Sequence, residues 1–120
     1  MSRLPRAAAL GALLGASACD YSVADIASVP DHPTYQADVR PLYEDHCNLC
    51  HGEKPDYGAP ATFRLDVYGD ANGVIGAASI SQRSLRSVER GRMPPVRIGS
   101  GLGPNGTELL RRWVADGSPE

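Results

Sequence analysis

The chain has 120 residues, of which 13 are glycine and 10 are proline, and only 6% are aromatic. One small domain is therefore expected, with few bulky side chains to bury and many positions that interrupt helices. The formal net charge is −2 and no basic patch with interleaved aromatic residues is present, which excludes the nucleic-acid-binding class.

Residues 1–19 have the pattern of a signal peptide. Arg3 and Arg6 form a short basic region, and the apolar run that follows, residues 7–16, is too short to span a bilayer. We therefore expect this leader to direct export and to be absent from the mature domain.

The end of the leader fits two processing routes. Ala16-Ser17-Ala18 suits ordinary signal peptidase, whereas Ser17-Ala18-Cys19 resembles a bacterial lipobox, in which the cysteine is lipidated and becomes the mature N-terminus. The leucine that usually stands three residues before that cysteine is replaced by Ala16. Lipidation of Cys19 is favoured because it would otherwise be a free or intermolecularly paired thiol. Two or more acyl chains would give a stable membrane anchor.

The segment 20–34 shows no clear periodicity and is predicted to be a flexible tether. A helix is predicted to begin with Asp38 as its N-cap and with Pro41 inside its first turn, where the missing N–H costs nothing. This helix is expected to continue through Tyr43 into residues 47–51.

The pentapeptide Cys47-Asn48-Leu49-Cys50-His51 is a C-x-x-C-H motif, which predicts covalent attachment of one c-type haem. Two thiols are needed for thioether bonds to the two vinyl groups of one porphyrin, and a two-residue spacer puts both on one face of a helix. His51 lies on the same face, so its imidazole can be the proximal iron ligand. The large apolar haem would also supply the core that the composition lacks.

Three other interpretations of this motif remain. A redox-active C-x-x-C usually lies in a βαβ context, and no strand-helix-strand pattern is recognised here. A zinc site needs further ligands, and the chain has no second C-x-x-C and no H-x-x-x-H. A disulfide between Cys47 and Cys50 would give His51 no role. His46 is too close to Cys47 to reach the opposite haem face and is expected to be a solvated polar residue.

The middle of the chain carries weaker signals. Residues 52–61 contain two glycines and two prolines and are predicted to form a loop. Leu65, Val67 and Tyr68 form a short apolar cluster that could pack on the haem edge. Residues 74–85 have apolar side chains at approximate helical spacing and are predicted to form a helix.

The second chemical signal is Gly91-Arg92-Met93-Pro94-Pro95, which contains the only methionine outside the leader. A thioether on a loop stiffened by two prolines is well suited to approach the iron from the distal side. Ligation by histidine and methionine stabilises ferrous haem and raises its reduction potential. The alternative is that Met93 fills the core, the commoner use of methionine, but a position directly before two prolines favours the ligand.

The clearest helical pattern spans residues 105–117. Asn105 is predicted to be the N-cap, Glu108 its capping-box partner, and Gly117 the residue that ends the helix at C′. The apolar face of this helix consists of Leu109, Leu110, Trp113 and Val114. Trp113 is expected to pack on the first helix as a core residue.

Together these motifs resemble the monohaem class I cytochrome c family. The resemblance is to its small exported or lipoprotein domains, which have a D-V-x-P-[IL] helix start, C-x-x-C-H-G, M-P-P and a final L-x-x-W-[VI] helix. The matching segments are residues 38–42, 47–52, 93–95 and 110–114. The resemblance implies an all-α domain, residues 35–119, around one covalent haem c, with the N- and C-terminal helices packed together.

The same resemblance implies roles for individual residues. Cys47 and Cys50 would form the thioethers, His51 would be the proximal ligand and Met93 the distal one. The middle of the chain matches the family least, so the partners of the haem propionates are open. On charge alone the candidates are Arg83, Arg86 and Arg92, with solvated surface arginines as the alternative.

The expected function is that of a one-electron carrier, not an enzyme, on the periplasmic side of a bacterial cell envelope. It would be a monomer, lipid-anchored or else soluble in the periplasm, with small and transient contacts to redox protein partners. One alternative is an electron-entry subunit of a larger oxidoreductase. Another is a haem peroxidase or gas sensor with an open distal site, which requires Met93 to be unbound. A bis-histidine carrier using His32 is a further variant.

Overall fold

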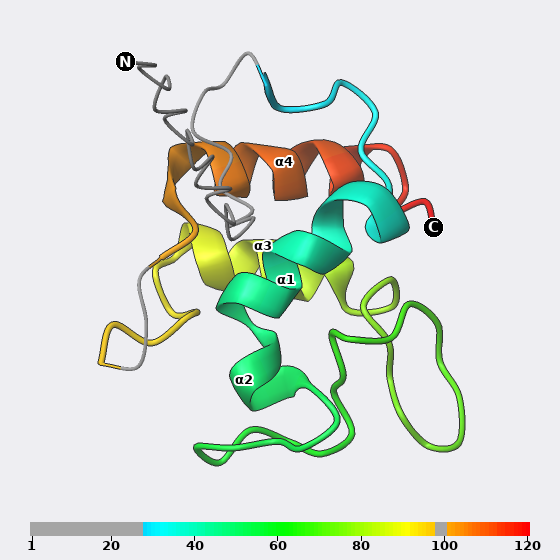
Figure 1. Ribbon diagram of the computed structural model, residues 1–120, viewed down its shortest axis with the longest axis vertical. Helices are drawn as coiled ribbons and strands as arrows, with labels where there is room; N and C mark the ends of the chain where they lie inside the picture. The colour runs from blue at the N-terminus through cyan, green and yellow to red at the C-terminus, as the bar shows by residue number, and fades with distance from the viewer. Residues whose placement is uncertain (1–27, 98–100) are drawn as a thin grey trace, which may run out of the picture.

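The computed structural model describes residues 28–97 and 101–120. In these ranges the chain forms a π-helical turn and four α-helices, namely η2 (Tyr35–Val39), α1 (Arg40–His46), α2 (Asn48–His51), α3 (Ser81–Glu89) and α4 (Gly103–Ala115). The described residues contain isolated β-bridges but no β-strand. The predicted all-α class is therefore confirmed for this part of the chain (Figure 1).

The first helical segment begins earlier than predicted. Thr34 is its N-cap, and the Thr34 hydroxyl accepts a hydrogen bond from the backbone N–H of Ala37 at 3.3 Å. The Asp38 carboxylate in turn accepts the backbone N–H of Thr34 at 2.9 Å, a reciprocal arrangement like a capping box. The prediction of Asp38 as N-cap is therefore wrong, because Asp38 reaches back to the cap from inside the turn.

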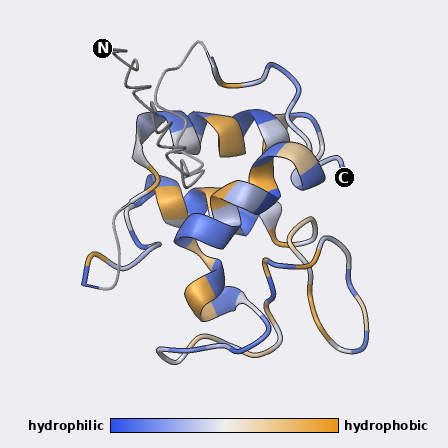
Figure 2. Ribbon diagram, in the orientation of Figure 1, coloured by the Kyte–Doolittle hydropathy of each residue, from blue (hydrophilic) through white to orange (hydrophobic). Residues whose placement is uncertain are grey.

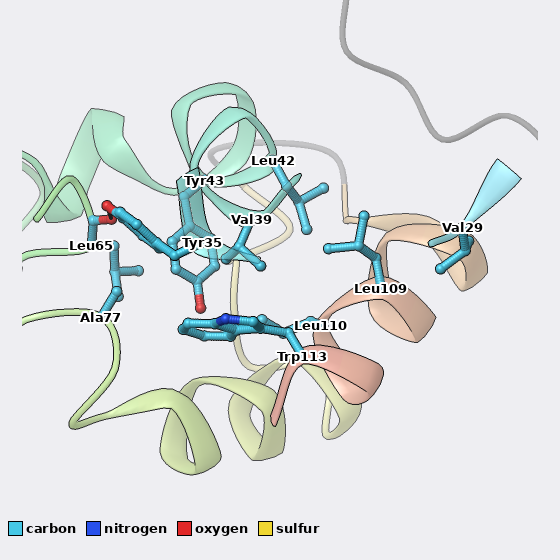
Figure 3. Packing of buried hydrophobic residues seen from close by; sticks show 10 residues of the cluster. All are labelled: Val29, Tyr35, Val39, Leu42, Tyr43, Leu65, Ala77, Leu109, Leu110 and Trp113. Atoms are coloured by element: carbon cyan, nitrogen blue, oxygen red, sulfur yellow. Dashed lines mark hydrogen bonds between the residues drawn. The ribbon is translucent and has the colours of Figure 1, made fainter. Parts of the chain in front are cut away.

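The core is built around Trp113 of α4, which is fully buried (Figure 3). The ring of Tyr35 from η2 lies 6.2 Å from the Trp113 ring, and that of Tyr43 from α1 lies 6.4 Å from it in an edge-on orientation. Within residues 28–97 and 101–120, the other buried hydrophobic residues are Val29, Val39, Leu42, Leu65, Ala77, Leu109 and Leu110. The predicted contact between Trp113 and the first helix is confirmed.

The C-terminal residues close this core. The carbonyl of Pro119 accepts hydrogen bonds from the indole Nε1 of Trp113 at 2.8 Å and from the backbone N–H of Tyr35 at 3.0 Å. Chain reversal after α4 uses Gly117, which has a φ of +85° and follows the C-cap, as predicted. The two ends of the domain are thereby fixed to each other.

The start of α4 differs from the prediction. The helix begins at Gly103, so Asn105 is inside the first turn and is not the N-cap. Pro104 suits that first turn because it has no N–H to leave unbonded. Glu108 makes no capping box, because its carboxylate accepts hydrogen bonds from Arg111 and Arg112.

Part of the predicted tether packs on the domain. The guanidinium of Arg112 donates hydrogen bonds to the carbonyls of Val29, at 2.8 Å, and Pro30, at 3.2 Å. The side chain of Val29 is buried in the core. Residues 29–33 are thus docked on α4, whereas residues 20–27 of the predicted tether lie outside the described residues.

The helix predicted over residues 74–85 is α3, which begins only at Ser81. Residues 77 and 78 are bonded elsewhere, since their N–H groups donate to the carbonyls of Val67 and Tyr68 at 2.9 and 3.0 Å. This pairing holds the chain in turns until Ser81. From there α3 packs on α4, and hydrophobic and hydrophilic segments alternate along both helices (Figure 2).

Gly76 is the point where this turn region is tightest. A Cβ atom on Gly76 would meet the carbonyl oxygen of Gly69 and would lie 2.5 Å from that of Tyr68, whereas a Cβ atom on Gly69 would meet nothing within 4 Å. We predict that Gly76→Ala lowers the free energy of unfolding by about 1–3 kcal/mol because backbone must move. Denaturant unfolding monitored by Trp113 fluorescence measures this. Gly69→Ala is the matched control, and equal losses in both variants would contradict the prediction.

Candidate functional site

The C-x-x-C-H segment forms a single helical turn that follows α1. The backbone N–H of Cys47 donates to the carbonyl of Tyr43 at 2.8 Å, which ends α1. The carbonyl of Cys47 then accepts the N–H groups of Cys50, at 3.1 Å, and His51, at 3.0 Å. The expected helical conformation is present, but the helix is interrupted at Cys47, where φ is −128°.

The residue after this turn has to be small. A Cβ atom on Gly52 would lie 2.5 Å from the carbonyl oxygen of Asn48, so only glycine fits without moving α2. The chain then returns to the turn, because the N–H of Asp56 donates to the Cys50 carbonyl at 3.3 Å and that of Leu65 to the His51 carbonyl at 2.8 Å. These bonds hold the loop that follows against α2.

A cavity of about 470 Å³ opens beside this turn. Its walls come from the end of α1, from α2, from the loop after α2, from α3 and from the Met-Pro-Pro segment. All four residues proposed from the sequence to hold a cofactor, Cys47, Cys50, His51 and Met93, line this one cavity. Its size is in the range of small-molecule and cofactor sites, and most of its wall is apolar. The fold thus brings together the four residues that the sequence singled out, and their role in holding a cofactor stays a prediction.

The protonation states at the turn suit an uncharged site. Burial raises the pKa of the Cys47 thiol to about 12, so this residue is a thiol at neutral pH. Burial also lowers the pKa of His51, which keeps the imidazole neutral, the form that binds metals. The Nδ1 atom of His51 is buried and has no hydrogen-bond partner. The imidazole is therefore not committed to a structural contact.

Met93 reaches the cavity from the loop that follows α3. Its backbone N–H and that of Arg92 both donate to the carbonyl of Ser87, at 3.2 and 2.9 Å, which fixes the loop to α3. The side chain of Met93 is 42% exposed, so the interpretation of Met93 as a core-filling residue is wrong. The thioether is free to contact a group bound in the cavity.

Several wall residues were not predicted from the sequence. Tyr57, Phe63, Ile80 and Val88 line the cavity together with the two prolines after Met93. Tyr57 and Phe63 are isolated aromatic residues in a glycine- and proline-rich segment, and this was the one signal that could have revealed them. The remaining wall residues have no pattern that separates them from core residues.

Two further expectations are corrected. Of the cluster predicted to pack on the haem edge, only Leu65 lines the cavity. Tyr68 instead packs on Tyr35, with ring centroids 5.5 Å apart, and its hydroxyl donates to the Ser118 carbonyl at 2.9 Å. His46 is half-buried in the cavity wall and is not simply a solvated residue.

The described residues give little support to the three alternative interpretations of the C-x-x-C-H motif. A redox-active C-x-x-C needs a thiol with a lowered pKa, and burial raises that of Cys47. The two thiols are not joined in a disulfide. Among residues 28–97 and 101–120, no group of three or more His, Cys, Asp and Glu side chains is placed to hold a metal ion, as zinc would require.

The other candidate residues lie apart from the turn. Arg83 lines the cavity, and Arg86 and Arg92 line a pocket next to it. His32 is not among the residues of the cavity wall, because its Nδ1 pairs with the Asp116 carboxylate at 2.9 Å beyond the end of α4. Cys19 lies outside the described residues.

Comparison of the chain with protein-family models, curated proteins and solved structures finds no match. Of the helices in the described ranges, none has the length and apolar character that crossing a membrane requires. The assignment of a function to the cavity therefore depends on its residues.

The pair formed by His32 and Asp116 predicts a pH dependence. The hydrogen bond and charge of Asp116 raise the pKa of His32 above 6.5, so the pair stabilises the fold fully below that pH and less as the pH rises through the higher folded-state value. His32→Ala should therefore lower the melting temperature more at about pH 6 than at about pH 8.5. Thermal unfolding at the two pH values measures this. An equal effect at both would contradict the prediction.

Proposed function

We propose that this protein is a one-electron carrier with a single covalently attached haem c in the cavity beside α2. The observation that carries the proposal is the meeting of two thiols, an imidazole and a thioether in the wall of one largely apolar cavity of about 470 Å³. The buried, unbonded Nδ1 of His51 and the exposed thioether of Met93 also fit this group.

The residues of the cavity have separate tasks in this proposal. The thiols of Cys47 and Cys50 would each add across one vinyl group and form a thioether. The neutral imidazole of His51 and the thioether of Met93 would be the axial ligands. A haem held there would supply reversible one-electron cycling between Fe(II) and Fe(III), at a potential raised by methionine ligation.

The rest of the wall would control access and contact. The apolar residues Phe63, Leu65 and Ile80 would shield a bound haem from water, which would favour the less charged ferrous state. Leu49 and Tyr57 are each 64% exposed and line the cavity, so its mouth is an apolar surface open to other molecules. Such a mouth suits the brief contacts that redox proteins make with one another.

The proposed location is the periplasmic side of a bacterial cell envelope, with a lipid anchor on Cys19. This part of the proposal rests on the leader and the lipobox-like tripeptide in the sequence. Mass spectrometry of the N-terminal peptide of exported protein tests it. Two or more acyl chains on Cys19 would support the anchor, and an N-terminus at another residue would contradict it.

Covalent attachment is tested with the double variant Cys47→Ala/Cys50→Ala, exported in a strain competent for cytochrome c maturation. Wild-type protein should give a positive pyridine haemochrome assay and gain the mass of one haem, whereas the variant should do neither, because no thioether can form. His46→Ala is the matched control, since His46 lines the same cavity without an assigned role. A colourless wild-type protein would overturn the proposal.

Ligation is tested separately with Met93→Ala. The ferric protein should lose the far-red absorption band that methionine ligation gives and should keep its covalent haem. His32→Ala should leave the spectrum unchanged, because His32 is not in the cavity wall. A high-spin ferric spectrum in wild-type protein would favour the peroxidase or gas-sensor alternative over electron transfer.

A further inference from the structure

A second pocket, of about 360 Å³, adjoins the cavity and is lined almost entirely by arginines. Arg83, Arg86 and Arg90 share one face of α3 and the turn after it, because they are three and four residues apart. Gly91, with a φ of +66°, then turns the chain back so that Arg92 completes the pocket. We refer to these four arginines and Ser87 as the arginine pocket.

The positive charge of the arginine pocket is not balanced within the described residues. No ion pair there involves any of its four arginines. Glu89 lies on the same helix but is paired with Arg111 of α4 at 3.0 Å. Arg83 stacks on Phe63 at 5.1 Å from the ring centroid, a contact that does not neutralise it. Four arginines without an ion-pair partner among the described residues thus line one pocket, in a chain whose net charge is −2.

The chemistry of the arginine pocket favours carboxylates. The planar guanidinium fork matches a carboxylate in two parallel hydrogen bonds. The two propionates of a haem would balance at most two of the four arginines, and only Arg83 lines both the cavity and the arginine pocket. Arg86, Arg90 and Arg92 are exposed to solvent and do not line the cavity. They are therefore available to an external anion.

We propose that the arginine pocket docks a carboxylate-rich surface of a redox protein partner beside the mouth of the cavity. This inference rests on the proposed function, because it assigns the partner of that same site. Val96, which follows Arg92 by four residues in the chain, is an apolar residue that is 90% exposed. An apolar contact flanked by charged groups is the usual arrangement at interfaces that rely on electrostatic attraction for rapid association.

The test uses two small redox reagents of opposite charge. Ferrous protein is oxidised in a stopped-flow instrument by hexacyanoferrate(III), an anion, or by tris(phenanthroline)cobalt(III), a cation. The variant is Arg86→Gln/Arg90→Gln, which removes two charges from the arginine pocket and none from the cavity wall. The control is Arg40→Gln/Lys54→Gln, which makes the same change in net charge at exposed positions outside the arginine pocket.

We expect oxidation by hexacyanoferrate(III) to slow by about tenfold in the arginine-pocket variant at an ionic strength of about 0.01 M, and the difference to disappear near 0.5 M. The control should stay within about twofold of wild type, and the cobalt reagent should not be slowed in either variant. Equal slowing in both variants would mean that only net charge matters, and no slowing would mean that the pocket does not attract anions. Either result overturns the inference.

Two further measurements distinguish this inference from binding of the haem propionates by the same arginines and from failure of the proposed function. If the arginines bind the haem propionates instead, the variant will change the midpoint potential and its pH dependence without altering the salt dependence, and the inference fails. Haem content is measured on each sample, so a colourless protein identifies failure of the proposed function. Fluorescence anisotropy of a fluorescein-labelled hexaglutamate peptide then reports on the surface without haem. Binding that is equal in both variants would overturn the carboxylate site itself.

Discussion

The rest of the domain depends on the two hydrogen bonds that the carbonyl of Pro119 accepts. This carbonyl accepts both the indole N–H of Trp113 and the backbone N–H of Tyr35, so the last residues, α4 and the first helical turn share one hydrogen-bond acceptor. The position of Tyr43 on Trp113 follows from this, and the carbonyl of Tyr43 receives the N–H of Cys47. The C-x-x-C-H turn is therefore oriented by the core.

The core and the cavity lie next to each other but have few residues in common. Of the ten hydrophobic residues that are buried in the described part of the chain, only Tyr43 and Leu65 also line the cavity. The helices around Trp113 have a core of their own, whereas the loop after α2 and the Met-Pro-Pro segment face the cavity. A bound haem would thus order mainly these two segments. It would contribute less to the packing of α1 and α4 than the composition of the chain suggested.

The sequence predicted those features that local chemistry decides. The spacing of Cys47, Cys50 and His51, the burial of Trp113 and the stop at Gly117 all follow from short-range rules. Helix starts at Asp38 and Asn105 were placed wrongly, because Thr34 and Pro104 offered better first turns. The place of Ile80 and Val88 in the cavity wall and the grouping of four arginines in one pocket could not be foreseen, since they depend on how the turns after α2 fold back on α3. The haem itself, its ligands and the lipid on Cys19 stay predictions.

The hydrogen bonds from Arg112 to the carbonyls of Val29 and Pro30 limit how far the domain could lie from a membrane. Val29 follows Cys19 by ten residues. A fully stretched chain of that length measures at most about 35 Å. If Cys19 carries the proposed acyl chains, the segment between Cys19 and Val29 keeps the domain close to the lipid headgroups. It would then exchange electrons only with proteins that come to the same membrane face, and diffusion along the bilayer would set how often they meet.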